Sequence, residues 1–378
     1  MIVKLPAGKC TIGSRWFMKV KFNANSSLDH YKARMVAKGY SQCPDFDFKE
    51  TFAPTVRYST IWIILTIAAL EDLELHSVDI SHAYLNGDLE EKIYMQQPEG
   101  FGVGEPEFVC KLKKSLYGLK QAGQVWNKKL HSVLLSMGFE CAQSDYGLYI
   151  FSRDDIHIFV PMFVDDITLA GKKGAKFDSL IEELSSHFKL RNLGPTTQLL
   201  GLEIHRDCPN HTLTISQSQF ITNLLQEHGL QDCKPVYTPL NPRCHLSTSM
   251  CPQSEAEALE MCQYPYISIV GSLMYLALTT RPDIAYAARV LARFDSNPGL
   301  PHWQAAKHVL RYLKGTVTHK LVYSPSTSSE PFITYSDSDH GVRAVYALAS
   351  ETSHATCKTP LLSVNPPRVV RVSIPCVY

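Results

Sequence analysis

The sequence lacks the cysteine spacing on which zinc-bound folds depend. It has 11 cysteines, but no two of them form a Cys-x-x-Cys pair that could join histidines in a zinc site. A structural zinc site and a disulfide framework are therefore not expected, and the cysteines fit a reducing compartment.

Long apolar runs are absent as well. The N-terminal residues MIVKLPAGKC have no apolar core of the kind found in a signal peptide. The longest apolar stretch, residues 61–70, is too short to cross a bilayer and is typical of a buried helix. We therefore expect no signal peptide, no transmembrane segment and no membrane partner.

The chain also lacks an excess of positive or negative charge. The chain has 37 Lys and Arg against 36 Asp and Glu, for a formal net charge of +1. The basic residues are nevertheless unevenly spread, because residues 1–60 hold ten of them against four acids, and residues 111–130 hold six Lys and no acid. Local basic surface is what a phosphate backbone needs, although a solvated charged face is the simpler explanation of the counts alone.

The chain of 378 residues is long enough for two or three subdomains, and its hydrophobic patterns predict both helices and strands. Alternating patterns predict strands at residues 16–22, 31–37, 75–80, 146–151, 156–164, 167–170, 199–205 and 211–216. Helical periodicity predicts helices at residues 59–71, 121–137, 174–188 and 217–228 and a helical region at 266–315. Polar segments at 241–260 and 324–331 are expected to be linkers.

Three aspartates mark the ends of predicted strands. Asp79 lies at the end of one strand, and Asp165 and Asp166 form the turn between two others. Strand ends can bring such groups to one edge of a sheet, where three carboxylates can hold two Mg²⁺ ions. A pair of aspartates in a turn is more often only a polar hairpin tip, so the pattern alone leaves both interpretations open.

A family resemblance favours the catalytic interpretation. The strings HSVDISHAYLNGDLEEKIYMQQPEGF, KSLYGLKQAGQVW and MFVDDITLAG resemble the catalytic blocks of the reverse transcriptases of copia-type LTR retrotransposon polyproteins. Five further strings resemble the same family in the same order, at residues 31–42, 49–60, 199–204, 268–287 and 302–316. The resemblance runs from about residue 4 to residue 340, and eight strings in one order make it specific.

The resemblance implies an α+β fold of the right-hand polymerase type. Such a fold has fingers, a palm with an antiparallel sheet and helices, and a helical thumb or connection. Residues 1–240 would form fingers and palm with the start of the thumb, and 241–323 the mostly helical thumb or connection. Residues 324–345 would be a truncated start of an RNase H domain, and 346–378 a non-homologous tail without regular structure.

The resemblance also implies an activity, RNA-directed DNA polymerisation by nucleotidyl transfer to a primer 3′-hydroxyl. Asp79, Asp165 and Asp166 would hold two Mg²⁺ ions, with Mn²⁺ as an alternative. The partners would be an RNA or DNA template with its primer and deoxynucleoside triphosphates (dNTPs). The protein would act in the cytoplasm, in the context of a virus-like particle, or in the nucleus.

The nucleotide-binding residues follow from the same motifs. Tyr84 matches the aromatic gate that excludes a ribonucleotide 2′-hydroxyl, and an ordinary core aromatic is the alternative. Gln121 matches a glutamine that contacts the incoming nucleotide. Lys32 and Arg34, on one face of a predicted strand, are both candidates for binding its triphosphate.

Two further assignments concern the primer and the leaving group. Leu200, Gly201 and Leu202 resemble the primer-grip hairpin, where a glycine would let two backbones approach each other. Lys189 is a candidate for protonating the leaving pyrophosphate, and a solvated lysine is the alternative.

The sequence departs from the family pattern at three places. Phe163 replaces the usual Tyr of the catalytic box, and Gly123 and Gln124 replace a Pro-Arg pair near the nucleotide site. Asp337 matches the first metal ligand of an RNase H domain, but Glu351 is the one acid after Asp339. We therefore expect RNase H activity to be lost.

These departures keep two other hypotheses open. The chain could be a decayed, catalytically impaired fragment that binds nucleic acid without catalysis. A domesticated host protein with an interaction role is the third hypothesis, and no sequence feature points to it.

Overall fold

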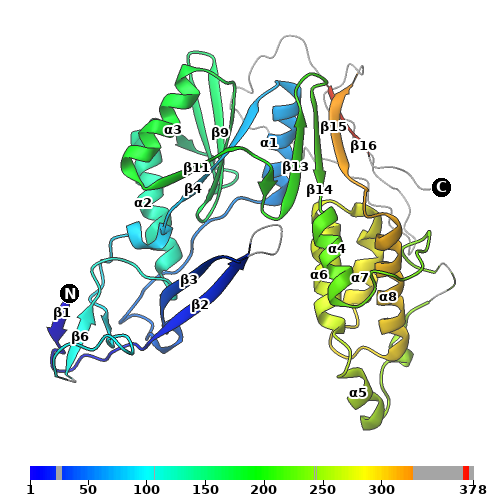
Figure 1. Ribbon diagram of the computed structural model, residues 1–378, viewed down its shortest axis with the longest axis horizontal. Coiled ribbons are helices and arrows are strands. Elements are labelled where there is room, and N and C mark those ends of the chain that lie inside the picture. The colour runs from blue at the N-terminus through cyan, green and yellow to red at the C-terminus, as the bar shows by residue number, and fades with distance from the viewer. Residues whose placement is uncertain (23–27, 106, 242, 244, 327–368, 374–378) are drawn as a thin grey trace. The chain divides into compact units, whose positions relative to one another are not determined.

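The chain folds into two units that contain both helices and sheets. The computed structural model describes residues 1–22, 28–105, 107–241, 243, 245–326 and 369–373 (Figure 1). Unit 1 consists of Met1–Ile64 and Leu73–Pro195, and unit 2 consists of Leu65–Asp72 and Thr196–Tyr378. The α+β prediction is confirmed at this level.

Unit 1 is built on an antiparallel sheet of six strands, in the order β11-β4-β10-β9-β8-β7. Its strands are β4 (Glu74–Ile80), β7 (Glu140–Cys141), β8 (Leu148–Arg153), β9 (Ile156–Phe163), β10 (Asp166–Gly171) and β11 (Leu190–Pro195). Helices α2 (Ala122–Ser136) and α3 (Ala175–His187) cover one face of this sheet (Figure 1).

The core between these helices and the sheet explains which strand residues face outward. Apolar side chains recur on α2 and α3 at helical spacing and are buried, among them Trp126, Leu130, Phe177, Leu180 and Leu184. They pack in one cluster with residues of β4 and β10, including Val78, Ile80, Ile167 and Leu169. Because strand side chains alternate between faces, the residues between these apolar ones point away from the helices.

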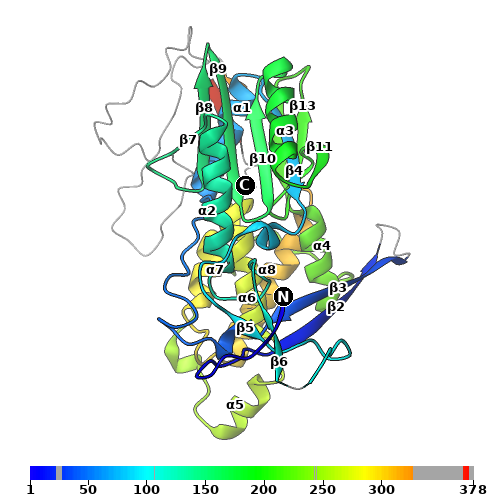
Figure 2. The same ribbon diagram turned by 90° about the vertical axis from the view of Figure 1, so that its left-hand side faces the viewer.

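The rest of unit 1 is smaller. Strands β1 (Ile2–Lys4), β6 (Phe108–Lys111) and β5 (Tyr94–Met95) form a three-stranded sheet. Strands β2 (Ser14–Phe22) and β3 (Leu28–Ala37) form a long two-stranded hairpin (Figure 2). The short helices η1 (Gly39–Ser41) and η2 (Ala83–Asn86) and helix α1 (Tyr58–Leu70) complete it, and the second half of α1 belongs to unit 2.

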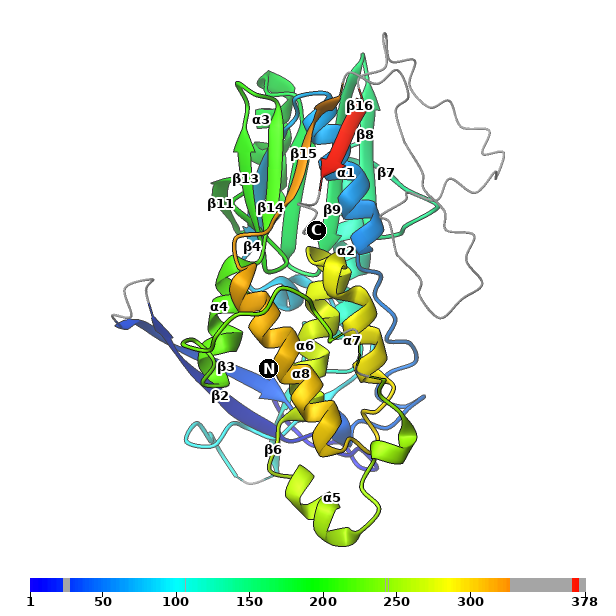
Figure 3. The same ribbon diagram turned by 90° about the vertical axis from the view of Figure 1, so that its right-hand side faces the viewer.

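Unit 2 combines an antiparallel sheet with a helical bundle. The sheet order is β12-β13-β14-β15-β16, with strands at Gln198–Leu199, Leu202–Asp207, Thr212–Ser216, Leu321–Ser326 and Val369–Ser373. Helices α4 (Ser218–Glu227), α6 (Tyr266–Thr279), α7 (Ala285–Ala292) and α8 (Leu300–Gly315) pack around one apolar cluster (Figure 3). The short helices are η3 (Thr248–Met250), α5 (Glu255–Met261) and η4 (Pro282–Ile284).

The sequence patterns locate most helices to within two residues, and several segments differ. The expected linker at 324–331 begins inside β15 (Leu321–Ser326). The expected linker at 241–260 contains α5, which begins after Ser254, whose hydroxyl accepts a hydrogen bond from the Glu257 amide. The helical region 266–315 is divided into three α-helices by the segments that hold Pro282 and Gly299. In the tail, residues 369–373 form β16 beside β15.

Asp337 and the expected RNase H start beyond residue 326 lie outside the described residues. In the part of the chain that the structure describes, no single helix is both long and apolar enough to cross a membrane. The bent pair α5 and α6 passes that test jointly, by length and composition only.

Candidate active site

Asp79 and Asp166 lie directly opposite each other on neighbouring strands. In the antiparallel pair β4 and β10, Asp166 is the register partner of Asp79. Such partners have Cα atoms about 5 Å apart and point to the same face of the sheet. Both aspartates alternate with buried residues of the core, so both carboxylates lie on the face away from α2 and α3. The sheet register thus brings together two aspartates that are 87 positions apart in the sequence.

Asp165 belongs to the tight turn that joins β9 to β10. Phe163 pairs with Asp166, which leaves a two-residue turn of Val164 and Asp165. Val164 has a φ of 61°, a conformation that a β-branched residue rarely adopts, because its side chain crowds the backbone there. Positive φ at the first of two central positions is typical of a type II′ hairpin turn, where glycine is the usual residue.

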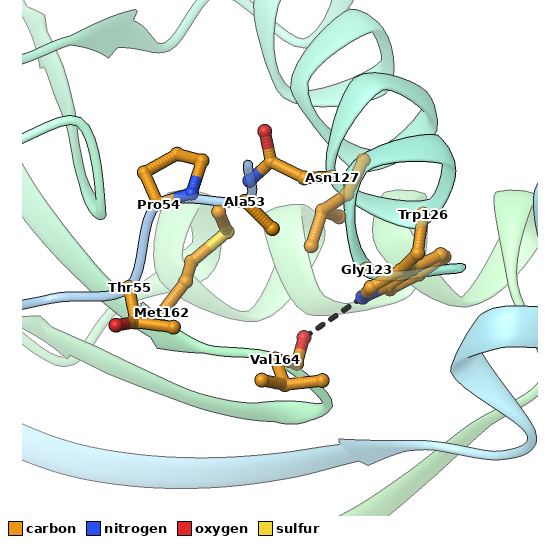
Figure 4. A pocket seen from close by; sticks show the side chains of 9 residues that line it. Ala53, Pro54, Thr55, Gly123, Trp126, Asn127, Met162 and Val164 are labelled. Carbon is orange, nitrogen blue, oxygen red and sulfur yellow. Dashed lines mark hydrogen bonds between the residues drawn. The ribbon is translucent and has the colours of Figure 1, made fainter. Parts of the chain in front are cut away.

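Contacts from behind hold this strained turn. The indole Nε1 of Trp126 donates a hydrogen bond of 2.8 Å to the carbonyl oxygen of Val164 (Figure 4). The Val56 amide donates to the Met162 carbonyl oxygen over 3.0 Å. Figure 4 shows the small pocket behind the turn, lined by Ala53, Pro54, Thr55, Gly123, Trp126, Asn127, Leu130, Met162 and Val164. The backbone of the turn is therefore fixed by α2 and by the segment before α1.

The charges of Asp165 and Asp79 act on Asp166. Partial burial, then the charges of Asp165 and Asp79, raise the pKa of Asp166 above its ordinary value. Carboxylate oxygens are hard donors of the kind that Mg²⁺ prefers. Among the described residues, however, no three His, Cys, Asp or Glu side chains are gathered closely enough to hold a metal ion as they stand. The donor type and the register fit a divalent cation, and the side chains do not yet enclose one.

Tyr84 lies beside these carboxylates. It is carried by η2, directly after His82, whose φ of 58° turns the chain away from β4. Burial and then the charge of Asp165 raise the pKa of Tyr84, so its phenol stays neutral. Its ring meets the ring of Tyr117 edge to face, with centroids 5.1 Å apart. Tyr84 is thus within electrostatic reach of Asp165.

Arg34, one of the two predicted phosphate-binding residues, contacts Tyr117 of this cluster. Its guanidinium carbon lies 4.8 Å from the centre of the Tyr117 ring. The buried Nε of Arg34 has no hydrogen-bond partner. Lys32 lies on the same face of β3, opposite Lys19 of β2. The hairpin register therefore places Lys19, Lys32 and Arg34 on one face of the hairpin, as the alternation predicted for Lys32 and Arg34.

Gln121 belongs to a buried hydrogen-bond network. It is 1% exposed, its side-chain oxygen accepts a hydrogen bond from Gln42, and its amide nitrogen donates 2.8 Å to the Asp47 carbonyl oxygen. Gln124, which replaces the family's arginine, donates 2.9 Å to the carboxylate of Glu50. In this conformation both side chains tie α2 to the segment that precedes α1.

Lys189 immediately precedes β11, and its carbonyl oxygen accepts a hydrogen bond from the Ser81 amide. Its own side chain is exposed. Two positions later, Arg191 is the direct register partner of Asp79, on the side of β4 opposite to Asp166. The sheet register therefore places Arg191 directly beside Asp79, and the role predicted for Lys189 stays a prediction.

The predicted primer grip forms the tip of the β12–β13 hairpin in unit 2. Leu199 pairs with Leu202, and the turn residues Leu200 and Gly201 have φ of 50° and 81°, as in a type I′ turn. The Tyr275 hydroxyl donates 2.9 Å to the Leu200 carbonyl oxygen, and a Cβ on Gly201 would lie 2.7 Å from that hydroxyl. The sequence predicted that Gly201 lets two backbones approach each other. In the structure, the group that approaches the Gly201 backbone is the Tyr275 hydroxyl.

Three residues of this site were missed in the sequence. Tyr117 and Trp126 lie within a string that carries the family resemblance, but nothing in that string showed which side chains reach the carboxylates. Arg191 lies outside the quoted strings, and only the pairing of β11 with β4 places it. Their roles depend on pairings between segments far apart in the sequence.

Comparison with known proteins agrees with these motifs. Residues 1–242 match the reverse transcriptase (RNA-dependent DNA polymerase) family. The chain is 42% identical over 342 residues to the retrovirus-related Pol polyprotein from transposon TNT 1-94 of Nicotiana tabacum, covering 89% of this chain and 26% of that protein. It is 37% identical over 335 residues to the corresponding polyprotein from transposon RE1 of Arabidopsis thaliana, covering 88% of this chain and 22% of that protein.

The chain thus spans about a quarter of the length of the first of these relatives. A shorter relative, a transposon Ty5-1 protein of Saccharomyces cerevisiae, is 34% identical over 277 residues, which are 73% of this chain and 86% of that protein. The resemblance to copia-type elements is confirmed, and the chain belongs to the reverse transcriptase (RNA-dependent DNA polymerase) family.

Proposed function

We propose that this chain extends a primer along an RNA or DNA template by adding deoxynucleotides to its 3′-hydroxyl. The observation that carries the proposal is the register of Asp79 against Asp166, with Asp165 in the adjoining turn. Two Mg²⁺ ions, when bound by these carboxylates, would activate the 3′-hydroxyl and stabilise charge on the triphosphate. Mn²⁺ is the alternative ion.

The surrounding side chains would position the nucleotide. Arg34 offers a buried Nε without a partner, which suits a phosphate oxygen as acceptor. Tyr84, a neutral phenol beside Asp165, would lie under the sugar and exclude a 2′-hydroxyl. Lys32 would add positive charge along the same face of the hairpin. Gln121 would support the loop, or contact the nucleotide after its buried network rearranges.

The right-hand polymerase division is part of the same proposal. The palm corresponds to the six-stranded sheet with α2 and α3, the fingers to the β2–β3 hairpin and its neighbours, and the thumb or connection to the helices of unit 2. Leu200, Gly201 and Leu202 would contact the primer. The partners would be primer–template and dNTPs, and the site of action the cytoplasm or the nucleus.

The alternative, a fragment that binds nucleic acid without catalysis, is not favoured. Its motivation was the replacement of a Pro-Arg pair by Gly123 and Gln124, together with the tail that does not resemble the family. Gln124 forms a hydrogen bond with Glu50. All three carboxylates are present, and the strain at Val164 resembles the backbone strain that functional sites store.

Primer extension tests the proposal. The purified chain should extend a primer on RNA and on DNA templates in the presence of Mg²⁺, and Asp165→Asn should lower the rate by roughly a hundredfold or more. Asp155→Asn is a matched control, because Asp155 is exposed in the turn between β8 and β9, at the end of β9 opposite to Asp165. Asp155 has a positive φ, which Asn tolerates. Extension unchanged in Asp165→Asn, or absent from the wild-type chain, would reject the proposal.

A further inference from the structure

Tyr117 lies between the proposed phosphate-binding arginine and the proposed sugar gate. Its ring contacts the Tyr84 ring edge to face, at 5.1 Å between centroids and an interplanar angle of 64°. The Arg34 guanidinium lies over the Tyr117 ring at 4.8 Å. Edge-to-face and cation–π contacts have directional preferences, so one ring limits the positions of both neighbours.

The backbone of Tyr117 is locked to the strand that carries Arg34. The Ala37 amide, at the end of β3, donates 2.8 Å to the Tyr117 carbonyl oxygen. Gly118 has a φ of 91°, and a Cβ there would collide with the carbonyl oxygen of Ala37. A Cβ on Gly39 would likewise collide with the carbonyl oxygen of Gly118. The absence of side chains at these two glycines lets the segments approach closely, so the backbone of Tyr117 is held against the end of β3.

The charges around Tyr117 keep its phenol neutral. Burial raises its pKa most, Arg34 lowers it, and Asp165 and Asp79 raise it again. The phenol is therefore within electrostatic reach of both Arg34 and the proposed metal-binding carboxylates. The buried Nε of Arg34 has no hydrogen-bond partner among the described residues, so it remains available for an anion.

We propose that Tyr117 is a positioning residue that fixes Arg34 and Tyr84 relative to each other, and thereby couples triphosphate binding to the choice of sugar. This inference rests on the proposed function, because it concerns the same nucleotide. Neither contact is made by the Tyr117 hydroxyl, so the aromatic ring alone carries the effect. The nucleotide selected is a deoxynucleoside triphosphate, held by its phosphates and tested at its 2′ position in one geometry.

The test compares Tyr117→Leu, which removes the ring, with Tyr117→Phe, which keeps it. Single-nucleotide incorporation of a dNTP and of the matching ribonucleotide (rNTP) gives KM and kcat for each. In Tyr117→Leu we expect KM for the dNTP to rise roughly fivefold and the dNTP/rNTP preference to fall roughly fivefold, as for loss of one ring contact. Tyr117→Phe should match the wild type in both values.

A double-mutant cycle separates positioning from general damage. Tyr84→Ala should lose sugar discrimination by itself. If Tyr117 acts through Tyr84, Tyr117→Leu in the Tyr84→Ala background should lower the dNTP/rNTP preference no further. Additive losses would overturn the inference. Where Tyr117→Leu does not fold, as judged by its melting temperature, Tyr117→Met replaces it, because Met fills the same space with a flexible side chain.

A binding measurement keeps this inference distinct from the proposed function. With a chain-terminated primer and Ca²⁺, the next dNTP should protect the protein–primer–template complex against a competitor more strongly than the rNTP does, and Tyr117→Leu should abolish that difference. If the wild-type chain extends primers but Tyr117→Leu behaves like the wild type in both assays, the inference is overturned while the proposed function stands. If the wild type extends no primer, the proposed function fails, and the binding assay alone decides on the inference. Loss of the dNTP–rNTP difference in Tyr117→Leu then supports the inference. A difference that is unchanged in Tyr117→Leu, or missing in the wild type, overturns it.

Discussion

Val164 holds a backbone conformation that costs about 1–2 kcal/mol for a residue with a side chain, in the turn that carries Asp165. Such strain persists only where neighbouring contacts over-determine the geometry. The indole of Trp126 supplies one such contact at the carbonyl oxygen of Val164 itself. At the scale of single residues, therefore, the position of the proposed catalytic carboxylates depends on a hydrogen bond from a helix that carries none of them.

The substitution Trp126→Phe tests this dependence. It removes the indole donor and keeps an aromatic side chain in the core, so the stability cost should be near 1 kcal/mol. We expect the extension rate to fall about tenfold and the Mg²⁺ concentration for half-maximal rate to rise, because the turn is less well fixed. Trp303→Phe, a buried tryptophan of unit 2, is the control. Unchanged Mg²⁺ dependence in Trp126→Phe would contradict this account.

At the scale of elements, a buried ion pair ties the junction of α6 and α7 to the end of α8. The Arg281 side chain is 1% exposed and donates two hydrogen bonds to the Asp283 carboxylate, at 2.9 and 2.7 Å. It also donates 3.1 Å to the Thr316 carbonyl oxygen, and the Tyr312 hydroxyl donates 2.8 Å to Asp283. Three helices of unit 2 therefore share one fully hydrogen-bonded charge pair.

This pair predicts a pH-dependent stability. Burial raises the pKa of Asp283, but hydrogen bonds from Arg281 and Tyr312 and the charge of Arg281 outweigh it, so the pKa lies below its ordinary value. The carboxylate therefore stabilises the fold at pH values above its pKa in the unfolded chain, which is about 4. This stability is lost as the pH falls through the pKa of Asp283 in the folded chain.

Asp283→Asn should therefore lower the free energy of unfolding by roughly 3 kcal/mol at pH 7. The difference from the wild type should shrink as the pH falls below about 4. Urea unfolding at several pH values measures both effects. Asp232→Asn, at an exposed position of the same unit, should cost little. A penalty for Asp283→Asn that is independent of pH would show that packing, not charge, explains the loss.

At the scale of the whole molecule, the two units are not consecutive in the sequence. Residues 65–72, the end of α1 and the turn after it, belong to unit 2 by their contacts, although unit 1 surrounds them in the chain. Leu65, Ala68 and Ala69 are buried, and Arg206 of β13 donates 3.1 Å to the Ala68 carbonyl oxygen. Unit 2 therefore depends on a segment encoded within unit 1.

A fragment of residues 1–195 tests this interdependence. It keeps all the carboxylates of the candidate site but takes residues 65–72 away from unit 2, leaving apolar surface exposed. We expect it to melt at a lower temperature than the full chain and to bind a hydrophobic dye. A chain that ends at Ser326 retains the core of both units. It should therefore melt at the temperature of the full chain and should not bind the dye. A sharp, dye-free unfolding transition for residues 1–195 would contradict the interdependence.

Much of this arrangement was predictable from local patterns. The apolar stripe of residues 121–137 predicted α2, and period-two alternation predicted the strands on either side of Asp165 and Asp166. Motif resemblance identified Asp79 and Tyr84 before any contact was known. The helix inside residues 241–260 was missed, because its sequence EAEALEM is acidic and short, and its cap at Ser254 became clear only from a hydrogen bond.

By itself the sequence determined the family, the α+β class, the three carboxylates and most element positions, because these depend on residue type and on periodicity within one segment. Only the tertiary structure decided that Asp166 faces Asp79, that Arg191 lies on the other side of Asp79, and that Tyr117 joins Arg34 to Tyr84. Such pairings join segments tens of residues apart. They are fixed by which apolar faces are buried against each other, and no local pattern records that choice.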